Sequence, residues 1–528
     1  MASVAADTNP VLDPGRDRLV IIASSLGTVF EWYDFFLYGI LASLLGRLFF
    51  ATGNPTTELL FSLGAFAVGF FFRPIGAVIF GHFGDKIGRK YTFLVTISLM
   101  GGATAAIGLL PTFASAGIWA PVLLLTLRTL QGMALGGEYG GAAIYVAEHA
   151  PPGRRGFYTS FIQVAASVGF LLCLLVVLTT RHAMSAESFE AWGWRVPFLV
   201  SLVLLALSLF IRMKLAESPV FQAMKSAGTT SKNPLLESFS DRANLGKVMV
   251  ALFGVTAGMT VIFYTSQFAT LYFLQGTTRI PEEQALLYLA VGAAIAAPAF
   301  IFAGWLSDKV GRKQLVLVGY GLTLALLFPI FHLIADGANP ALAEATRASP
   351  VTIELPACDY SVFVKPDSDC GKAIEFISKR GIDHAKTPAA ELALVVGGKR
   401  VPGFDKAAYT AALVSAGYPD VADPARIVHW KIILGIVLLV GLTGLTYGPL
   451  AAILVEMFPA KIRYTSLSIP YHIGSGYFGG FLPLISQYII VRTGDAFAGL
   501  WYTIVVVAVA FVVSAIWLRD TRNVDISL

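Results

Sequence analysis

Twelve apolar segments, each long enough to cross a bilayer as a helix, constrain this chain more than any other feature of its sequence. A membrane-spanning helix needs roughly 20 mainly apolar residues. Of the 528 residues, 56% are hydrophobic and only 13% are charged, which leaves too little polar surface to coat several water-soluble domains. The sequence therefore predicts an all-α membrane protein with twelve transmembrane helices in two six-helix bundles. The predicted spans cover about 19–46, 57–81, 91–111, 119–147, 157–180, 195–213, 248–274, 284–304, 314–335, 428–455, 464–491 and 497–518.

Two sequence patterns occur once in each half of the chain, which indicates an internal duplication. The segment Gly81-His-Phe-Gly-Asp-Lys-Ile-Gly-Arg-Lys90 returns 223 residues later as Gly304-Trp-Leu-Ser-Asp-Lys-Val-Gly-Arg-Lys313. The stretch 136–148 is similar to 444–456, which lies 308 residues later. The two offsets differ by 85 residues, so an insertion of that size must lie between the two later copies.

The polar segment 336–427, between the ninth and tenth predicted spans, is the expected insertion. It alternates strand-like and helix-like runs, so we expect a small α+β domain rather than a disordered loop. Cys358 and Cys370 lie in this segment and can form a disulfide in an oxidising compartment, although the sequence leaves the paired and free states equally open. The runs are Val351–Leu355, Tyr360–Val364, Ala373–Lys379 and Lys406–Val414.

The expected domain organisation follows from these landmarks. A first bundle with its N-terminal tail occupies 1–213, a polar cytoplasmic linker occupies 214–247, and a second bundle occupies 248–528 around the insertion. Lys and Arg residues in short loops resist translocation across a membrane, and about twenty of them lie on one side against five on the other. This asymmetry predicts that both termini are cytoplasmic and that the insertion is outside.

Other functional classes find little support in the sequence. The net charge is +5, but the cations form no long basic tract with interleaved aromatic residues, so we expect no nucleic-acid partner. The sequence has no metal-ligand spacing, phosphate-binding loop or nucleophile elbow. We therefore expect no enzymatic activity, no metal and no cofactor.

The repeated Gly-x-x-x-Asp-Lys-x-Gly-Arg-Lys segment resembles the signature loop of the major facilitator superfamily. Three further segments resemble the metabolite:proton symporter family: Glu31-Trp-Tyr-Asp-Phe-Phe-Leu-Tyr-Gly39, Phe72-Arg-Pro-Ile-Gly76 and Arg128-Thr-Leu-Gln-Gly132. Glu217-Ser-Pro219, Tyr447-x-Pro449 and Glu456-x-Phe458-Pro459 agree with this resemblance, which covers nearly the whole chain except the insertion. It implies a bacterial inner-membrane transporter whose two bundles rock around a central site.

The resemblance also implies a charge network on the cytoplasmic side that latches one conformation. In both repeats an acid at the end of a helix is followed by cations: Glu148 by Arg154 and Arg155, and Glu456 by Lys461 and Arg463. An ordinary positive-inside loop would not require Asp and Gly at fixed offsets. The residues assigned to this latch are Gly81, Asp85, Arg89, Glu148, Arg154, Asp308, Arg312 and Glu456.

Three carboxylates inside predicted spans are candidates for proton coupling, because an ionisable group within a membrane normally faces an aqueous cavity or a partner. Glu31, Asp34 and Tyr38 share one helical face, so the two carboxylates are expected to point together toward a central cavity. Adjacent carboxylates disfavour double ionisation, which raises the proton affinity of one of them. Glu138 is the third candidate, and a structural ion pair with Arg128 or Arg73 is the competing role for these acids.

Arg128 is the main candidate for binding an anionic substrate, because its planar guanidinium matches a carboxylate. A structural bridge to Glu138 or Asp34 is the alternative. Arg73 is expected to be structural because it lies closer to the cytoplasmic latch. Tyr264 and Gln267 are at least as compatible with packing and interhelical hydrogen bonds as with substrate contact. His472 can titrate near neutrality, but a lone histidine in a glycine-rich helix is more often a satisfied packing residue. The further substrate-binding candidates are Tyr38, Gln131, Tyr264, Gln267, Tyr447, Tyr471 and His472.

The sequence and the resemblance together predict a monomeric secondary transporter that couples proton entry to uptake of a small organic acid, such as a di- or tricarboxylate. A zwitterion such as proline or betaine is the main alternative, and a sugar fits the charged cavity less well. A sensor or receptor built on the same scaffold is the alternative from another class. Substrate accumulation under an imposed pH gradient would separate carrier from sensor.

Overall fold

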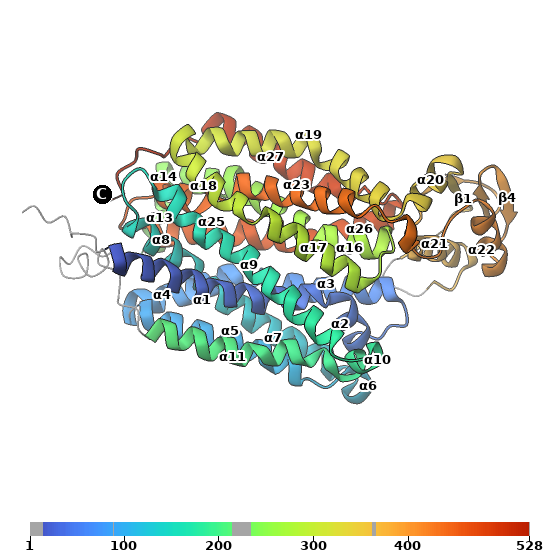
Figure 1. Cartoon of the computed structure of the whole chain (residues 1–528), viewed down its shortest axis with the longest axis horizontal. Coiled ribbons are helices and arrows are strands. Elements are labelled where there is room, and N and C mark those ends of the chain that lie inside the picture. Colours follow the sequence, from blue (N-terminus) through green and yellow to red (C-terminus); the bar gives the residue numbers. More distant parts are fainter. Residues whose placement is uncertain (1–13, 88, 214–233, 359, 362–365, 527–528) are drawn as a thin grey trace, which may run out of the picture.

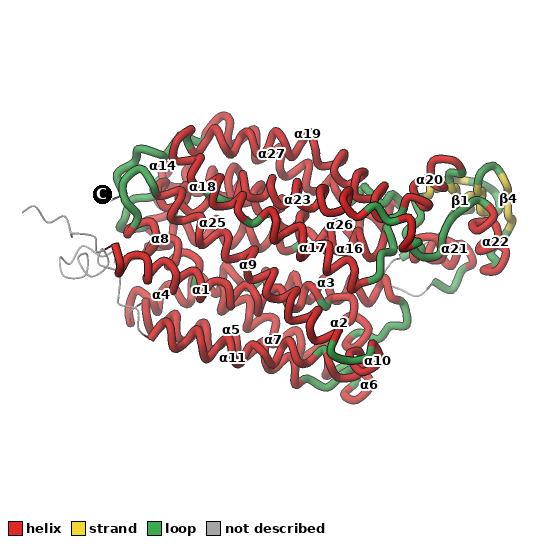
Figure 2. The backbone as a smooth tube through the Cα atoms, in the orientation of Figure 1, coloured by secondary structure: helices red, strands yellow, loops and turns green. Residues whose placement is uncertain are grey.

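The computed structural model describes residues 14–87, 89–213, 234–358, 360–361 and 366–526. Long helices run roughly parallel in two groups, and a small sheet lies beyond one end of the bundle (Figures 1 and 2). We call this end the insertion side. The opposite end, where the first helix begins and where the chain ends, is called the terminal side.

The first half of the chain forms one group of helices. Four of its six spans are broken in the described residues: the first bends by 60° after Ile40, the second is interrupted at Phe72, the fourth is interrupted at Gly137 and Glu138, and the sixth bends by 55° at Trp194. The elements are α1 (Pro14–Ile40), α2 (Ala42–Phe49), α3 (Pro55–Phe71), α4 (Arg73–Ile87), α5 (Arg89–Leu109), α6 (Phe113–Ala116), α7 (Trp119–Gly136), α8 (Tyr139–His149), α9 (Arg155–His182), α10 (Ala186–Ser188), the π-helix η1 (Phe189–Gly193) and α11 (Arg195–Met213).

The second half forms the other group. Its elements are α13 (Pro234–Ser240), α14 (Arg242–Met249), η2 (Val250–Thr256), α15 (Ala257–Tyr264), η3 (Thr265–Ala269), α16 (Thr270–Tyr272), η4 (Phe273–Thr277), α17 (Glu282–Ala296), α18 (Pro298–Val310), α19 (Arg312–Ala338), α23 (His429–Tyr447), α24 (Leu450–Met457), α25 (Arg463–Ile473), η6 (Gly474–Gly480), α26 (Leu482–Thr493) and α27 (Leu500–Trp517).

The predicted twelve-helix architecture is confirmed. Within the described residues, seven helices are long and apolar enough to span a membrane, and two pairs bent by more than 40° bring this number to nine. The other three spans are shorter, broken or more polar. The fourth, for example, carries Arg128 and Gln131 within α7, and the eleventh is interrupted by η6.

The seventh span, Arg242–Thr277, alternates α-helical turns with the π-helical segments η2, η3 and η4. A π-turn widens the helix by one residue and is frequent at functional sites. In the eleventh span, η6 has the sequence Gly-Ser-Gly-Tyr-Phe-Gly-Gly. Here Gly480 meets the ring of Phe70 and Gly476 meets the Phe70 carbonyl, so both positions have no room for a side chain. The eleventh span therefore approaches the first half closely at Phe70.

The two halves also touch through backbone atoms near the terminal side. A Cβ atom added to Gly156 would lie 2.5 Å from the Gly304 carbonyl oxygen, and one added to Gly304 would lie 2.4 Å from the Gly156 carbonyl oxygen. Small residues at such crossings let membrane helices pack at close range. The glycines hold α9 and α18 together at the contact between the halves.

The insertion is a compact α+β domain, as predicted from its alternating pattern. It contains α20 (Pro340–Ala348), β1 (Val351–Leu355), α21 (Asp369–Lys379), β2 (His384–Pro388), β3 (Ala393–Val396), β4 (Lys399–Pro402), α22 (Lys406–Ser415) and the short η5 (Pro424–Arg426). The sheet order is β2-β1-β3-β4, with β1 parallel to β2 and antiparallel to β3. Its own core includes Ile353, Phe376, Ile377, Leu394 and Tyr409. Most of the expected strand Tyr360–Val364 lies outside the described residues.

The expected linker 214–247 is only partly described, because 214–233 lie outside the described residues. From Pro234 onward the chain is helical. Asn244 donates hydrogen bonds to the Ser238 carbonyl and to the hydroxyl of Ser466, at 2.6 and 3.2 Å. These contacts fix α13 and α14 against α25 of the second half.

Cys358 and Cys370 form a disulfide, with their Cα atoms 6.3 Å apart. We therefore expect only Cys173, of the three cysteines, to react with iodoacetamide in denatured, unreduced protein. Replacing the pair with serine should destabilise the insertion by about 3 kcal/mol, because the unfolded chain regains the freedom that closure of this 12-residue loop removes. Intact-mass spectrometry before and after reduction checks the pairing, and three alkylations without reduction would contradict it.

Candidate functional site

Two fully buried arginines from the first half lie near the contact between the halves. Arg128, on α7, donates to Gln131 Oε1 at 2.8 Å and to the Phe66 carbonyl oxygen at 3.2 Å. Gln131 in turn donates to the hydroxyl of Thr104 at 2.6 Å. This chain of hydrogen bonds fixes the guanidinium of Arg128 and leaves only its Nε without a partner among the described residues.

Arg73, the first residue of α4, is in a different situation. It is 0% exposed, and none of its three guanidinium nitrogens has a hydrogen-bond partner among the described residues. Its Cζ lies 5.3 to 5.9 Å from the ring centroids of Trp32, Phe35, Phe70 and Tyr471. A buried cation whose donors are unsatisfied is costly unless an anion joins it. Arg73 is therefore poised to receive an anionic group.

The second half supplies neutral polar groups around Arg73. Tyr264 on α15 and Tyr471 on α25 both lie beside its guanidinium, and Tyr264 also faces Arg128. His472 follows Tyr471 and feels the charge of Arg73. The Tyr264 hydroxyl, the Gln267 side-chain amide and both ring nitrogens of His472 have no hydrogen-bond partner in the described part of the chain. These groups are all buried, so the second half holds unused donors and acceptors in addition to the unpaired guanidinium of Arg73 in the first half.

Aromatic rings enclose these polar groups. Tyr139 of the first half stacks on Tyr471 of the second, with centroids 3.5 Å apart and planes at 8°, and the Tyr471 hydroxyl lies 3.1 Å from that of Tyr447. Tyr38 lies under Arg128, with 4.6 Å between Cζ and the ring centroid, and its hydroxyl is 3.2 Å from Ser62 Oγ. The remaining rings of this wall are Trp32, Phe35, Phe36, Phe66, Phe70, Phe263 and Phe268.

Asp34 does not face the second half, contrary to the expectation that Glu31 and Asp34 point together into a central cavity. Its carboxylate lies beside Ser201 of α11 and Cys173 of α9, and its Oδ1 has no hydrogen-bond partner among the described residues. The neighbouring Tyr33 donates to the Pro197 carbonyl oxygen at 2.7 Å, which holds this face of α1 against α11. Asp34 is thus a buried acid within the first half, while Glu31 and Glu138 are 6% and 1% exposed.

The structure brings most of the predicted substrate-binding residues together and adds Arg73. Sequence reasoning assigned Arg73 a structural role, whereas its guanidinium has no hydrogen-bond partner among the described residues and lies among rings of both halves. The expectation that His472 is a satisfied packing residue is also not met. The aromatic wall was missed, although the run Trp32-Tyr-Asp-Phe-Phe36 in a predicted span carried a signal for it. Arg73 can be recognised as a site residue only from the structure, which places rings of both halves around its guanidinium.

Comparison with known proteins agrees with this architecture. The family model described as "Sugar (and other) transporter" matches residues 19–238. The shikimate transporter of Escherichia coli K12 is 38% identical over 343 residues, which cover 63% of this chain and 76% of that protein. The inner membrane metabolite transport protein YhjE of the same organism is 32% identical over 488 residues, covering 91% of this chain and 90% of YhjE. The chain belongs to the sugar and metabolite transporter family of the major facilitator superfamily.

A solved structure of the proton:xylose symporter XylE bound to 6-bromo-6-deoxy-D-glucose shares the fold. Its TM-score is 0.64 at 16% identity, and the match covers 97% of this chain and 98% of that one. This likeness shows the fold, while the relatives named above make the chain a secondary transporter of the major facilitator superfamily.

On the terminal side of the transporter, ion pairs cross between the halves. Glu148 of the first half pairs with Arg463 of the second at 3.3 Å, and Arg155 of the first half lies 3.8 Å from Glu456 of the second. In the sequence each acid is followed by cations of its own repeat, but the structure exchanges these partners. Lys461 instead pairs with Glu237 at 2.9 Å.

On the terminal side of the transporter, Asp308 of the second half bonds directly to the backbone of the first half. Its two oxygens accept hydrogen bonds from the backbone N–H groups of Gly156 and Phe157, both at 2.8 Å, at the first turn of α9. A carboxylate is favoured at a helix N-terminus, where the backbone donors are unpaired. Arg312 holds Asp308 at 2.7 Å and Glu456 at 3.0 Å, so one guanidinium joins both acids.

The C-terminal segment of the transporter runs across the same network. Thr521 donates to Glu456 at 2.7 Å, and Arg463 donates to the Ile526 carbonyl oxygen at 2.7 Å. Arg155 of the first half donates to the Val524 carbonyl oxygen at 2.7 Å. Sequence reasoning gave this tail no role, yet it ties both halves together. Of the other predicted latch residues, Arg154 is exposed, and the side chains of Gly81, Asp85 and Arg89 lie outside the described residues.

Proposed function

We propose that the transporter couples proton entry to the uptake of a small organic acid by alternating access. One observation carries the proposal: Arg73 presents an unpaired guanidinium between the two halves. A carboxylate is the natural counter-ion, because its two oxygens match the guanidinium fork. Alternating access requires the two halves to rock about this contact, so the substrate would hold them together as it binds.

Each residue of the site receives a role in this proposal. Arg73 binds the carboxylate, and Arg128 supplies a second positive charge that Gln131 and Tyr38 position. A second charge favours a substrate with more than one carboxylate. Tyr264, Gln267 and His472 offer neutral hydrogen bonds to the rest of the substrate, and Tyr447 positions Tyr471.

Asp34 is proposed as the main proton carrier, with Glu31 and Glu138 as further candidates. Because Asp34 is packed against α9 and α11, its protonation would act on the packing of the first half rather than by touching the substrate. Burying a protonated acid among these apolar helices costs less free energy than burying a carboxylate. Binding and release of one proton would thus bias the helices that surround the site.

Asp34→Asn tests this role. We expect the variant to lose uphill uptake driven by a pH gradient while it retains counterflow exchange, because exchange needs no net proton movement. Proteoliposomes loaded with unlabelled organic acid measure both activities in one preparation. Persistent uphill accumulation by the variant would remove Asp34 as the coupling residue.

A zwitterion such as a betaine is the second candidate substrate. The observation in its favour is the aromatic wall, since ring faces attract ammonium groups while Arg73 would bind the carboxylate. A counterflow screen of dicarboxylates, aromatic hydroxy acids and betaines on purified protein separates the two classes. Failure to accumulate any of them under a pH gradient would instead favour a sensor.

We also propose that both termini are cytoplasmic, that the insertion is periplasmic, and that the transporter works as a monomer in a bacterial inner membrane. The positive-inside distribution of Lys and Arg supports the orientation. The disulfide in the insertion agrees with it, since disulfides persist in an oxidising compartment. Labelling of an engineered surface cysteine in the insertion by a membrane-impermeant maleimide tests the orientation on intact cells.

A further inference from the structure

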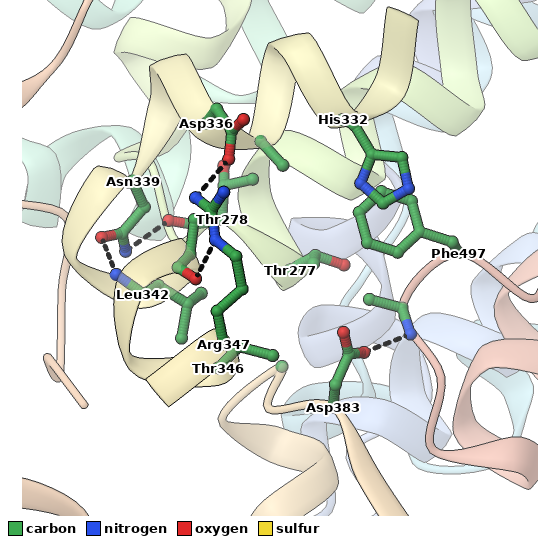
Figure 3. A pocket seen from close by; sticks show the side chains of 14 residues that line it. Thr277, Thr278, His332, Asp336, Asn339, Leu342, Thr346, Arg347, Asp383 and Phe497 are labelled. Carbon is green, nitrogen blue, oxygen red and sulfur yellow. Dashed lines mark hydrogen bonds and ion pairs between the residues drawn. The ribbon is translucent and has the colours of Figure 1, made fainter. Parts of the chain in front are cut away.

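A cavity of about 410 Å³ lies where the insertion meets the membrane helices of the second half, away from Arg73 and Arg128. Five segments contribute to it: the end of η4, the end of α19, α20, the loop after α21 and the loop before α27 (Figure 3). Small-molecule sites in proteins have volumes of roughly 300–1,000 Å³. The cavity is therefore large enough for a ligand.

The walls of the cavity are firmly joined. Gly381 has a φ of +57°, and a Cβ atom there would lie 2.4 Å from the Gly276 carbonyl oxygen, so only glycine lets the insertion approach η4 this closely. Asn339 donates to the Thr278 carbonyl oxygen at 3.1 Å and accepts from Leu342 N–H at 3.1 Å. His384 N–H donates to the Gly494 carbonyl oxygen at 3.1 Å. These contacts make the cavity a preformed feature.

Asp383 provides the floor of the cavity. One of its carboxylate oxygens accepts a hydrogen bond from Ala496 N–H at 2.6 Å, and the other is turned toward the cavity (Figure 3). No Lys, Arg or His side chain of the described residues forms an ion pair with it, and the nearby Asp495 adds a like charge. Burial raises the pKa of Asp383 to about 6, which still leaves the carboxylate ionised above neutral pH.

Among the described residues that line the cavity, Arg347 is the one Lys or Arg, and it is already engaged. Arg347 pairs with Asp336 at 3.0 Å and donates through Nε to the Ala343 carbonyl oxygen at 3.0 Å, and this pair lies at the exposed rim. Two carboxylates against one guanidinium leave an excess of one negative charge. On another wall, the rings of His332 and Phe497 lie 4.2 Å apart, and the face of a phenylalanine ring attracts cations.

We infer that this cavity is a binding site for a small organic cation, whose ammonium group lies between the Asp383 carboxylate and the ring of Phe497. A metal ion fits less well, because the described residues include no cluster of three His, Cys, Asp or Glu side chains. An anionic ligand would meet the unneutralised carboxylate. The inference is independent of the proposed transport function, since none of its residues lies near Arg73.

Binding of tetramethylammonium to the purified full-length protein tests the inference, with calorimetry at pH 7.5 and sodium chloride of equal ionic strength as the reference. We expect wild type to bind, and Asp383→Asn to bind roughly tenfold more weakly or not at all, because charge-assisted contacts are lost. The asparagine oxygen can still accept from Ala496 N–H, which preserves the fold. Phe497→Leu should weaken binding without changing any charge.

Asp420→Asn is the matched control, because Asp420 is an insertion acid that lies 3.6 Å from Arg380 and does not line the cavity. This control and Arg73→Gln should bind tetramethylammonium like wild type, which separates the cavity from the central site. Unchanged binding by Asp383→Asn, or no binding by wild type, would overturn the inference. Preferential binding of acetate over tetramethylammonium would overturn it as well.

Discussion

Uptake of the organic acid is expected to fall roughly a hundredfold or more when Arg73 is replaced by glutamine. Glutamine keeps a polar group in the site but removes the charge and the bidentate fork. Truncating one partner of a buried, hydrogen-bonded charge pair costs about 2–5 kcal/mol, and each 1.4 kcal/mol is tenfold. Radiolabelled uptake and counterflow in proteoliposomes measure the loss, which should appear in both because binding itself is affected.

Arg195→Gln is the control for this substitution. Arg195 is also an arginine of the first half, but it donates to the Gly108 and Leu110 carbonyl oxygens at 2.9 and 2.7 Å on the insertion side. Its loss should reduce thermal stability while transport per folded molecule stays close to wild type. If Arg73→Gln transported at the wild-type rate, the carboxylate would have to bind elsewhere, and Arg128 would become the main candidate.

Asp308→Asn is expected to open the terminal side of the transporter. The substitution weakens two charge-assisted hydrogen bonds to the first turn of α9 and the ion pair with Arg312. Hydrogen bonds to charged groups contribute about 1.5–3 kcal/mol each, so the conformational equilibrium should shift roughly tenfold or more. Substrate identity should not change, because Asp308 lies outside the central site.

Alkylation of a buried reporter cysteine measures this shift. Ser160→Cys places the thiol beside Gly304 in the contact between the halves, in a background where Cys173 is replaced by alanine. The rate of reaction with a membrane-permeant maleimide should rise in Asp308→Asn. Asp241→Asn is the matched control, since Asp241 caps α14 through Ala243 N–H and makes no bridge to the described residues of the first half. Equal rates in both variants would show that Asp308 does not hold this side closed.

Much of the architecture was predictable because it depends on local composition. The spans could be predicted because the bilayer core holds no water, so a helix that crosses it must be mainly apolar. The insertion was predictable from the difference between the two repeat offsets, and its α+β structure was predictable from alternating strand-like and helix-like runs. The exchange of partners between Glu148 and Arg463 was not predictable, because sequence proximity favours pairing within a repeat while the glycine contact of α9 with α18 brings the two halves together.

The site was harder to predict than the fold. Helical rise gives the depth of a residue in the membrane, but the direction of a side chain also depends on breaks and widened turns. The interruption at Phe72 redirects α4, so Arg73 meets rings from both halves. Asp34 and Glu31 were expected together from their spacing alone, but α11 covers the face that carries Asp34. Side-chain direction therefore required tertiary structure.

The insertion projects beyond the helical bundle and is built on the second half, while Asn54 of the first half reaches it through a hydrogen bond to Glu375 (Figure 1). Its rigid, disulfide-closed body offers an epitope clear of a detergent micelle. An antibody fragment bound there would serve as an alignment marker for electron microscopy and would travel with one half only. The angle between that marker and the first half would then report each step of the transport cycle directly in single-particle images.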